Sequence, residues 1–382
     1  MQYCLFIILL LAGIVNAAPV TVQKMSYKGI VPRFGSVAEP GQIKMPFVVS
    51  EDKNLASKIN LQLFVKLLTI LPPVKYSEFF VTPSGSLNDD VIVGQEFSVA
   101  RNDGKILTIF FNQTGVGAHE GSSTFSVSFD LSGGREILIG ELLTPKGLKI
   151  IGSTLNRKIE DEYKSGMLSF KKELTELKQE SLSDESFAEI KSNLESSIEL
   201  ANSCAGGDGH ADRSPGAVEE SNYADRSNWG LTNNEFQLTN SGGCFPYYAR
   251  GMDPVSVVSV LIPFTQLEPQ MTPYAKHLLL SKGAATAPDA TYGHVLKGFL
   301  GTKTPVTMYV NKTESGQVSG YYFYDKYQKS IEINGKEIDG NLELSEKDAE
   351  GNDQLRFHLK VLPNQLRGRW VGNKEFEFNV SY

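Results

Sequence analysis

Few residues of this 382-residue chain have types and spacings that suit catalysis. No two of its five histidines stand at a metal-ligand spacing, and the H-E-x-x-H pattern of zinc hydrolases does not occur. The G-x-S-x-G turn of serine hydrolases is also absent from the sequence. The sequence therefore predicts no catalytic residue, no metal site and no cofactor. We expect a protein that is not an enzyme, with an unrecognised hydrolase as the alternative.

Two histidines stand beside other polar groups. His119 lies in a glycine-rich turn next to Glu120, where its ring could bind a ligand or hydrogen-bond the backbone of the turn. His210 stands between Asp208 and Asp212, a group that could hold a cation but lacks the closing Glu of an EF-hand loop. We take His119 as a candidate binding residue and assign no metal to the second group.

Aromatic side chains give a further indication of a binding surface. In the run Val318–Tyr324, strand alternation places Tyr322 and Tyr324 on one face and Tyr321 and Phe323 on the other. Tyr and Trp side chains bury a large area and keep a polar tip, which suits contact residues. The alternative for these rings is core packing and cross-strand pairing. The candidate binding residues are Tyr321, Tyr322, Tyr324 and Trp370.

Composition limits the classes of protein to consider. Lys plus Arg number 37 and Asp plus Glu 44, a net charge of −7, which argues against a general nucleic-acid binder. Hydrophobic residues make up 41 %, enough to exclude a wholly disordered chain.

The start of the chain has the pattern of an export signal. Leu5–Val15 is continuously apolar, too short for a membrane span but suited to a signal peptide. Val15 and Ala17 fit the positions before a cleavage site, so we expect residues 1–17 to be removed after Ala17. A buried N-terminal helix is the alternative. The mature protein should be periplasmic or secreted, with no membrane span.

Two cysteines, Cys204 and Cys244, remain after this cleavage. In an oxidising compartment two such thiols usually pair. Their bridge would close a loop of about 40 residues, which the chain-entropy model values at roughly 4 kcal/mol. No CxxC pattern or Cys/His cluster supports a metal site or a reactive thiol instead. The sequence predicts a structural disulfide.

Patterning of residues 18–289 predicts an α+β domain built on an antiparallel sheet with helices. A helical period over Asn54–Leu71 ends at Pro72-Pro73. Ile137–Leu143 is typical of a short strand or turn, and Val255–Pro263, nearly continuously apolar, of a central strand. The other predicted strands are Met45–Ser50, Phe97–Ala100, Ile106–Asn112, Thr124–Asp130 and Trp229–Leu238.

The segment 156–244 stands apart as an acidic helical stretch followed by a disulfide loop. Residues 156–226 hold nine basic and sixteen acidic residues, a net charge of −7. This equals the net charge of the whole protein. Helices are predicted over Leu148–Lys164 and Ser165–Leu200, the second broken at Leu182-Ser183-Asp184. The acidic run is either a solvated helix face or a surface that meets a basic partner.

Residues 290–382 predict a second, all-β domain after the small-residue linker Ala284–Asp289. Eight short strands within about 90 residues favour a small eight-stranded antiparallel barrel. We expect the two domains to fold separately and the disulfide to act on the first alone. The predicted strands are Val295–Leu300, Val306–Asn311, Val318–Tyr324, Lys329–Ile333, Asn341–Glu346, Leu355–Leu362, Gln365–Val371 and Glu375–Val380.

Ordered motifs over about residues 40–280 resemble the extracytoplasmic domain shared by RsiV anti-sigma factors and PdaC-type peptidoglycan deacetylases. They are Pro46–Ser50 with the Asn60-containing helix, Gly115–His119, Phe125–Asp130, Gly133-Gly134, Glu141–Leu143, Phe236–Thr239 and Val260–Leu267. The resemblance implies a cell-envelope protein, and RsiV is a lysozyme receptor. The zinc-ligand pattern of the PdaC catalytic domain is absent from this sequence.

The second domain resembles a β module common in secreted bacterial proteins. Its marks are Gly320–Tyr324, Ile331–Gly335, Asp339–Glu346 and Gly368–Trp370. We therefore expect a non-catalytic envelope protein that binds a lysozyme-like or other basic cell-wall enzyme. The alternatives are a barrel that holds a small ligand or peptidoglycan fragment, and an accessory of a cell-wall hydrolase.

Overall fold

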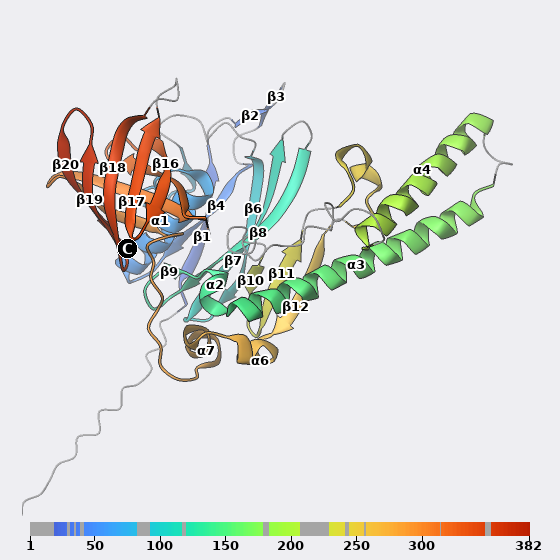
Figure 1. Cartoon of the computed structure of the whole chain (residues 1–382), viewed down its shortest axis with the longest axis horizontal. Coiled ribbons are helices and arrows are strands. Elements are labelled where there is room, and N and C mark those ends of the chain that lie inside the picture. Colours follow the sequence, from blue (N-terminus) through green and yellow to red (C-terminus); the bar gives the residue numbers. More distant parts are fainter. Residues whose placement is uncertain are drawn as a thin grey trace, which may run out of the picture.

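The computed structural model describes residues 19–28, 31–33, 36–38, 42–81, 92–116, 120–178, 183–206, 229–240, 244–255, 257–313, 315–347 and 353–382. Figure 1 shows a β-barrel at one end, an α+β body in the middle and a pair of long helices at the other end. Within these residues no helix has the length and apolarity needed to cross a membrane. The predicted signal peptide, His119 and the Asp208–Asp212 group lie outside the described residues.

The first part of the body packs one helix, α1 (Lys53–Leu68), against two small sheets. Asp52 caps α1 by accepting hydrogen bonds from the backbone N–H groups of Asn54 and Leu55, and the helix ends before Pro72 as predicted. One sheet has the order β4-β1-β5 and the other β6-β7-β8-β9. The strands are β1 (Thr21–Tyr27), β4 (Lys44–Val49), β5 (Phe79–Phe80), β6 (Ile92–Asn102), β7 (Ile106–Val116), β8 (Glu120–Asp130) and β9 (Arg135–Glu136), beside a hairpin of β2 (Val31–Arg33) and β3 (Ser36–Ala38).

The second part of the body packs the proximal half of a long helix, α3 (Pro145–Glu176), against a sheet of order β10-β11-β12. The predicted disulfide is confirmed, since Cys204 and Cys244 are bonded within this core. The remaining elements are α2 (Ile139–Leu142), α4 (Asp184–Cys204), β10 (Trp229–Leu231), β11 (Glu235–Asn240), η3 (Tyr247–Met252), β12 (Val258–Pro263), α6 (Phe264–Leu267), η4 (Glu268–Gln270) and α7 (Pro273–Leu280).

Three predicted elements of the body differ from the structure. The Ile137–Leu143 segment forms the single helical turn α2, because the Glu141 carboxylate accepts the Leu138 N–H at 3.0 Å. The Val255–Pro263 run is not central: β12 is an edge strand, and Leu261 on it is 54 % exposed. The Trp229–Leu238 segment is a hairpin, β10 and β11, and not one strand. An apolar run alone does not show whether a segment forms a short helix, an edge strand, a central strand or a hairpin.

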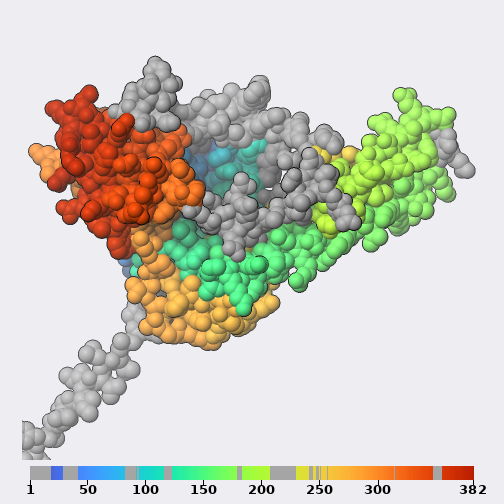
Figure 2. All heavy atoms as spheres, viewed as in Figure 1, coloured from blue at the N-terminus to red at the C-terminus, as the bar shows by residue number. Residues whose placement is uncertain are grey.

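Two long antiparallel helices form the arm, which we define as α3 from Lys164 onward together with α4. Ser183 caps α4 by accepting the Ser186 N–H at 3.2 Å, which confirms the predicted break before Asp184. Tyr163 anchors the base of the arm: its hydroxyl donates to Asp253 and accepts the Cys244 N–H at 2.6 Å. Figure 2 shows the distal part of the arm standing clear of the body.

The C-terminal strands close into an antiparallel barrel, as predicted. Its interior is filled by its own side chains, among them Tyr322, Phe357 and Phe378. The ring centre of Phe357 lies 5.3 Å from that of Tyr322 and 5.1 Å from that of Phe378. The strands are β13 (Val295–Leu300), β14 (Thr304–Lys312), β15 (Gln317–Tyr324), β16 (Ser330–Ile338), β17 (Asn341–Lys347), β18 (Asp353–Leu362), β19 (Gln365–Val371) and β20 (Glu375–Ser381).

The barrel rests on α1 of the body, at a contact we call the junction. Leu61 and Val65 of α1 form a buried apolar cluster with Val295 and Phe323 of the barrel. Polar contacts accompany it: the Tyr321 hydroxyl donates to the Val65 carbonyl at 2.7 Å, and Gln62 accepts the Val295 N–H at 3.1 Å. The two domains therefore share a buried surface besides the linker.

Candidate functional site

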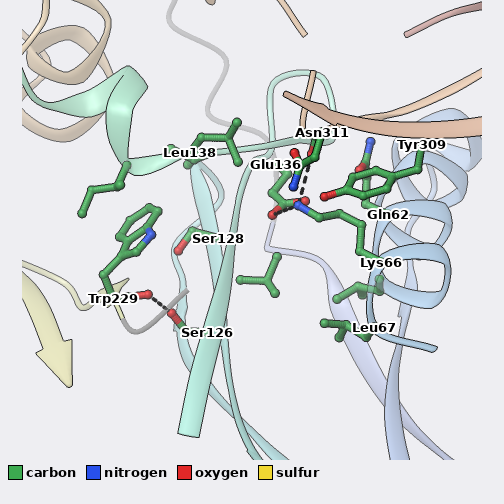
Figure 3. Close-up of a pocket in the computed structure, with 15 residues that line it drawn as sticks. Gln62, Lys66, Leu67, Ser126, Ser128, Glu136, Leu138, Trp229, Tyr309 and Asn311 are labelled. Atoms are coloured by element: carbon green, nitrogen blue, oxygen red, sulfur yellow. Dashed lines mark hydrogen bonds and ion pairs between the residues drawn. The ribbon is translucent and has the colours of Figure 1, made fainter. Parts of the chain in front are cut away.

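A cavity of about 220 Å³ lies at the junction, with walls from both domains (Figure 3). We call it the junction cavity. Helix α1, strands β8 and β9, and the start of α2 supply one side, and β10 and β14 contribute further side chains. The lining residues are Gln62, Leu63, Lys66, Leu67, Ser126, Val127, Ser128, Glu136, Ile137, Leu138, Ile139, Trp229, Gly293, Tyr309 and Asn311.

An ion pair stands in the wall of this cavity. Lys66 Nζ lies 2.7 Å from Glu136 Oε1 and donates to the Gly293 carbonyl at 3.1 Å. The same ammonium lies 5.5 Å from the centre of the Tyr309 ring, within cation–π range. Glu136 is 6 % exposed, and its second oxygen, Oε2, is buried and accepts no hydrogen bond from any described residue.

Burial sets the protonation of this pair. It raises the pKa of the Glu136 carboxyl above its ordinary value, and the nearby Lys66 charge offsets this only in part. For Lys66, burial alone would lower the pKa, but the Glu136 carboxylate more than compensates and the pKa is raised. Lys66 therefore stays charged across the neutral range, and it holds Glu136 as its counter-ion.

A second set of buried polar groups lies behind the cavity wall. Arg135 pairs with Glu141 and donates from Nη1 to the carbonyl of Pro288 in the linker at 2.5 Å. Burial raises the pKa of Glu141 to about 7, despite the opposing Arg135 charge. Burial and the Arg135 charge lower the pKa of His294 to about 4, and its Nε2 lies 3.0 Å from the Glu136 carbonyl.

Two aromatic rings and two hydroxyls complete the site. In Figure 3 Trp229 lies on the left and Tyr309 on the right, and the Glu136 carboxylate is seen between them. The Ser126 hydroxyl donates to the Trp229 carbonyl, which fixes β10 against β8, and Ser128 Oγ lies 2.9 Å from Thr108 Oγ1. The Trp229 and Tyr309 rings line the same cavity as the buried Glu136 acceptor, a combination that suits a small polar molecule.

The predicted aromatic residues separate into two places. Tyr321 is part of the junction, where it hydrogen-bonds α1. Tyr322 is buried in the barrel and its hydroxyl donates to Glu346 Oε2 at 3.1 Å. Tyr324 and Trp370 are half-buried: Tyr324 follows the junction residue Phe323, and Trp370 lies near the end of β19. The Trp370 Nε1 is buried with no hydrogen-bond partner among the described residues.

The residues of the junction cavity were not predicted from the sequence. One signal was present: Lys66 falls on the apolar face of the predicted helix, three residues after Leu63 and seven after Ile59. A lysine at such a position needs a buried counter-ion or a path to solvent. Glu136, on a two-residue strand, gives no comparable signal, because its partner Lys66 lies 70 residues earlier in the chain.

Comparison with known proteins identifies similar structures. One is a DUF3298 family protein from Bacteroides fragilis, which is 14 % identical in sequence. The match covers 70 % of this chain and all of the Bacteroides fragilis protein, at a TM-score of 0.37. Another is a DUF3298 family protein from Pseudomonas aeruginosa, 10 % identical, with 68 % and 98 % covered and a TM-score of 0.35. DUF3298 is the family of the RsiV/PdaC-type domain, which the sequence motifs resemble. No family model and no curated protein matches the chain.

Proposed function

We propose that this protein is an exported, non-catalytic binding protein that holds a small neutral fragment of cell-wall type in the junction cavity. The observation that carries the proposal is the buried Oε2 of Glu136, an acceptor without a partner among the described residues. Leaving such a group unpaired costs about 1–3 kcal/mol or more. A ligand hydroxyl or amide N–H that donates to Oε2 would remove this cost.

The charge and size of the site narrow the ligand class. Lys66 and Glu136 already neutralise each other, so a charged ligand would be buried without a counter-ion. A cavity of about 150 Å³ binds a benzene ring, and the junction cavity at about 220 Å³ can take one sugar ring. An N-acetylated amino sugar offers hydroxyl and amide donors and an apolar face for Trp229 or Tyr309. The cavity thus replaces the barrel interior as the place of the predicted fragment site.

Export is part of this proposal. Cleavage after Ala17 follows from the signal-peptide pattern, and a disulfide is typical of proteins outside the reducing cytoplasm. We place the mature protein in the periplasm or the medium.

Calorimetric titration of the chain 18–382 with N-acetylglucosamine and with its neutral disaccharide tests the proposal. We expect binding that Asn311→Ala weakens at least fivefold, because Asn311 lines the cavity from the barrel side. Asn373→Ala, at an exposed asparagine in the turn between β19 and β20 that does not line the cavity, is the matched control and should bind as the wild type does. No binding of either fragment to the folded wild-type protein would refute the proposal.

A second function, binding of a basic cell-wall enzyme such as lysozyme, is favoured by the surface of α4. Five carboxylates are exposed along α4. Lys191 is the only basic residue of this helix. At 100° per residue they share an arc opposite the buried Ser197, Ala201 and Cys204. A one-sided negative surface on a projecting arm would speed encounter with a cationic protein. The carboxylates belong to Asp184, Glu185, Glu189, Glu195 and Glu199.

Titration with egg-white lysozyme at low and physiological salt tests this second function. The triple variant Asp184→Asn, Glu189→Gln, Glu195→Gln should weaken binding at least tenfold at low salt. A barrel variant with the same loss of charge, Glu332→Gln, Asp339→Asn, Glu377→Gln, should weaken it less than twofold. No heat and no inhibition of lysozyme at either salt concentration would exclude this partner.

A further inference from the structure

Strands β17 to β20 present two adjacent rows of side chains on the outer surface of the barrel. Cross-strand pairing places Asn341, Lys360, Arg367 and Asn379 side by side in one row, which we call the cationic row. The next row, two residues along each strand, consists of Glu343, His358, Arg369 and Glu377. Both rows are exposed.

The two rows differ in charge balance. In the second row His358 lies 3.7 Å from Glu343, and Arg369 pairs with the nearby Glu375 at 2.8 Å. In the cationic row Lys360 and Arg367 are directly opposite each other, so their Cβ atoms stand about 5 Å apart. Neither makes an ion pair with any described residue, and like charges in this arrangement destabilise a sheet. The neighbours in the row are neutral amides.

The surface is hollowed at the same place. A groove of about 500 Å³ runs over β17, β18 and β19, and another of about 370 Å³ over β19 and β20. Arg367, Gly368 and Arg369 line both grooves. At Gly368 the neighbouring strand comes so close that a Cβ would stand 2.0 Å from the His358 carbonyl oxygen, so only glycine fits there. Because Arg367 lines both grooves, it is accessible from both sides.

We propose that the cationic row is a binding site for a phosphate-type oxyanion. An anion between Lys360 and Arg367 converts their repulsion into two attractions. The Arg fork can donate two parallel hydrogen bonds to phosphate oxygens, while the Lys ammonium adds a point charge. Asn379 stands at one end of the row with its Oδ1 held by Gln365, so its Nδ2 can donate to a remaining oxygen. Asn341, at the other end, donates its Nδ2 to the Ile338 and Asp339 carbonyls. This site is independent of the junction cavity and of the acidic arm.

Calorimetric titration of the chain 18–382 with inorganic phosphate and with a short polyphosphate, at constant ionic strength, tests the proposal. We expect saturable binding of both, tighter for polyphosphate, that Lys360→Gln with Arg367→Gln weakens at least tenfold. Lys303→Gln with Lys329→Gln removes the same charge from exposed barrel positions and should change the affinity less than twofold. Equal losses in both variants, or no saturable binding, would overturn the proposal.

Thermal unfolding gives a second readout that does not depend on the titration. Without phosphate, the Lys360→Gln, Arg367→Gln variant should unfold at the wild-type temperature or above it, because the repulsion is gone. Phosphate should raise the unfolding temperature of the wild type and the control but not of this variant. Binding of RNA without binding of phosphate or polyphosphate would point to a different class of ligand and contradict the inference.

Discussion

At the scale of single residues, the Lys66–Glu136 pair places two buried charges in the wall of the junction cavity. A buried charge is tolerated only with its partner, so removing one member leaves the other uncompensated. We expect Lys66→Met to lower the free energy of unfolding by about 3 kcal/mol. The double variant Lys66→Met, Glu136→Met should recover a large part of this loss. Urea denaturation at pH 7 measures both, and additive losses in the double variant would contradict a coupled pair.

Two neighbouring residues give opposite pH dependences. The folded-state pKa of Glu141, about 7, lies above its ordinary value of 4.5, so the folded state binds the proton more tightly and loses stability as the pH rises from 4.5 to 7. Glu141→Gln removes this loss. The stability of the variant relative to the wild type should therefore increase across that window, by up to about 3 kcal/mol.

For His294 we expect the opposite dependence of stability on pH. Its folded-state pKa, about 4, lies below the ordinary 6.5, so it favours the folded state increasingly as the pH rises from 4 to 6.5. His294→Gln should lose stability relative to the wild type over that range. Urea denaturation from pH 4 to 8 separates the two residues, and slopes of the same sign in both variants would contradict the assignment.

At the level of elements, glycines permit the close strand contacts of the barrel. A Cβ on Gly298 of β13 would stand 1.8 Å from the Asn379 carbonyl oxygen of β20, at the seam that closes the barrel. We expect Gly298→Ala to lower the free energy of unfolding by about 3 kcal/mol. Gly140→Ala in α2, where a Cβ meets nothing within 4 Å, is the control and should be neutral or stabilising. Equal effects in urea denaturation would argue against close contact at the seam.

Sequence patterns predict elements well where local rules decide them. The eight barrel strands, the Ser183 helix start and the Cys204–Cys244 bridge follow from alternation, capping and cysteine count. The single turn of α2 and the edge position of β12 depend on contacts made after the chain folds. The junction cavity is the extreme case, since Lys66 and Tyr309 are far apart in the chain and meet only when the barrel docks on α1.

For the whole molecule, the junction changes how the two domains should unfold. The sequence alone predicts separate unfolding, with reduction of the disulfide affecting only the first domain. The cluster of Leu61, Val65, Val295 and Phe323 couples them. We expect reduction to lower both calorimetric transitions of the wild type, and Phe323→Ala to leave the barrel transition insensitive to reductant. A barrel transition in the wild type that ignores reduction would mean that the junction adds little stability.

We propose that the junction cavity receives a neutral, donor-bearing ligand through Glu136. A crystal structure of the protein grown with saturating N-acetylglucosamine would locate this ligand. We expect density for the sugar between Trp229 and Tyr309, with one of its hydroxyl or amide groups about 3 Å from Glu136 Oε2. Density for the sugar elsewhere, with the Oε2 acceptor satisfied by water alone, would show that Glu136 does not hold the ligand.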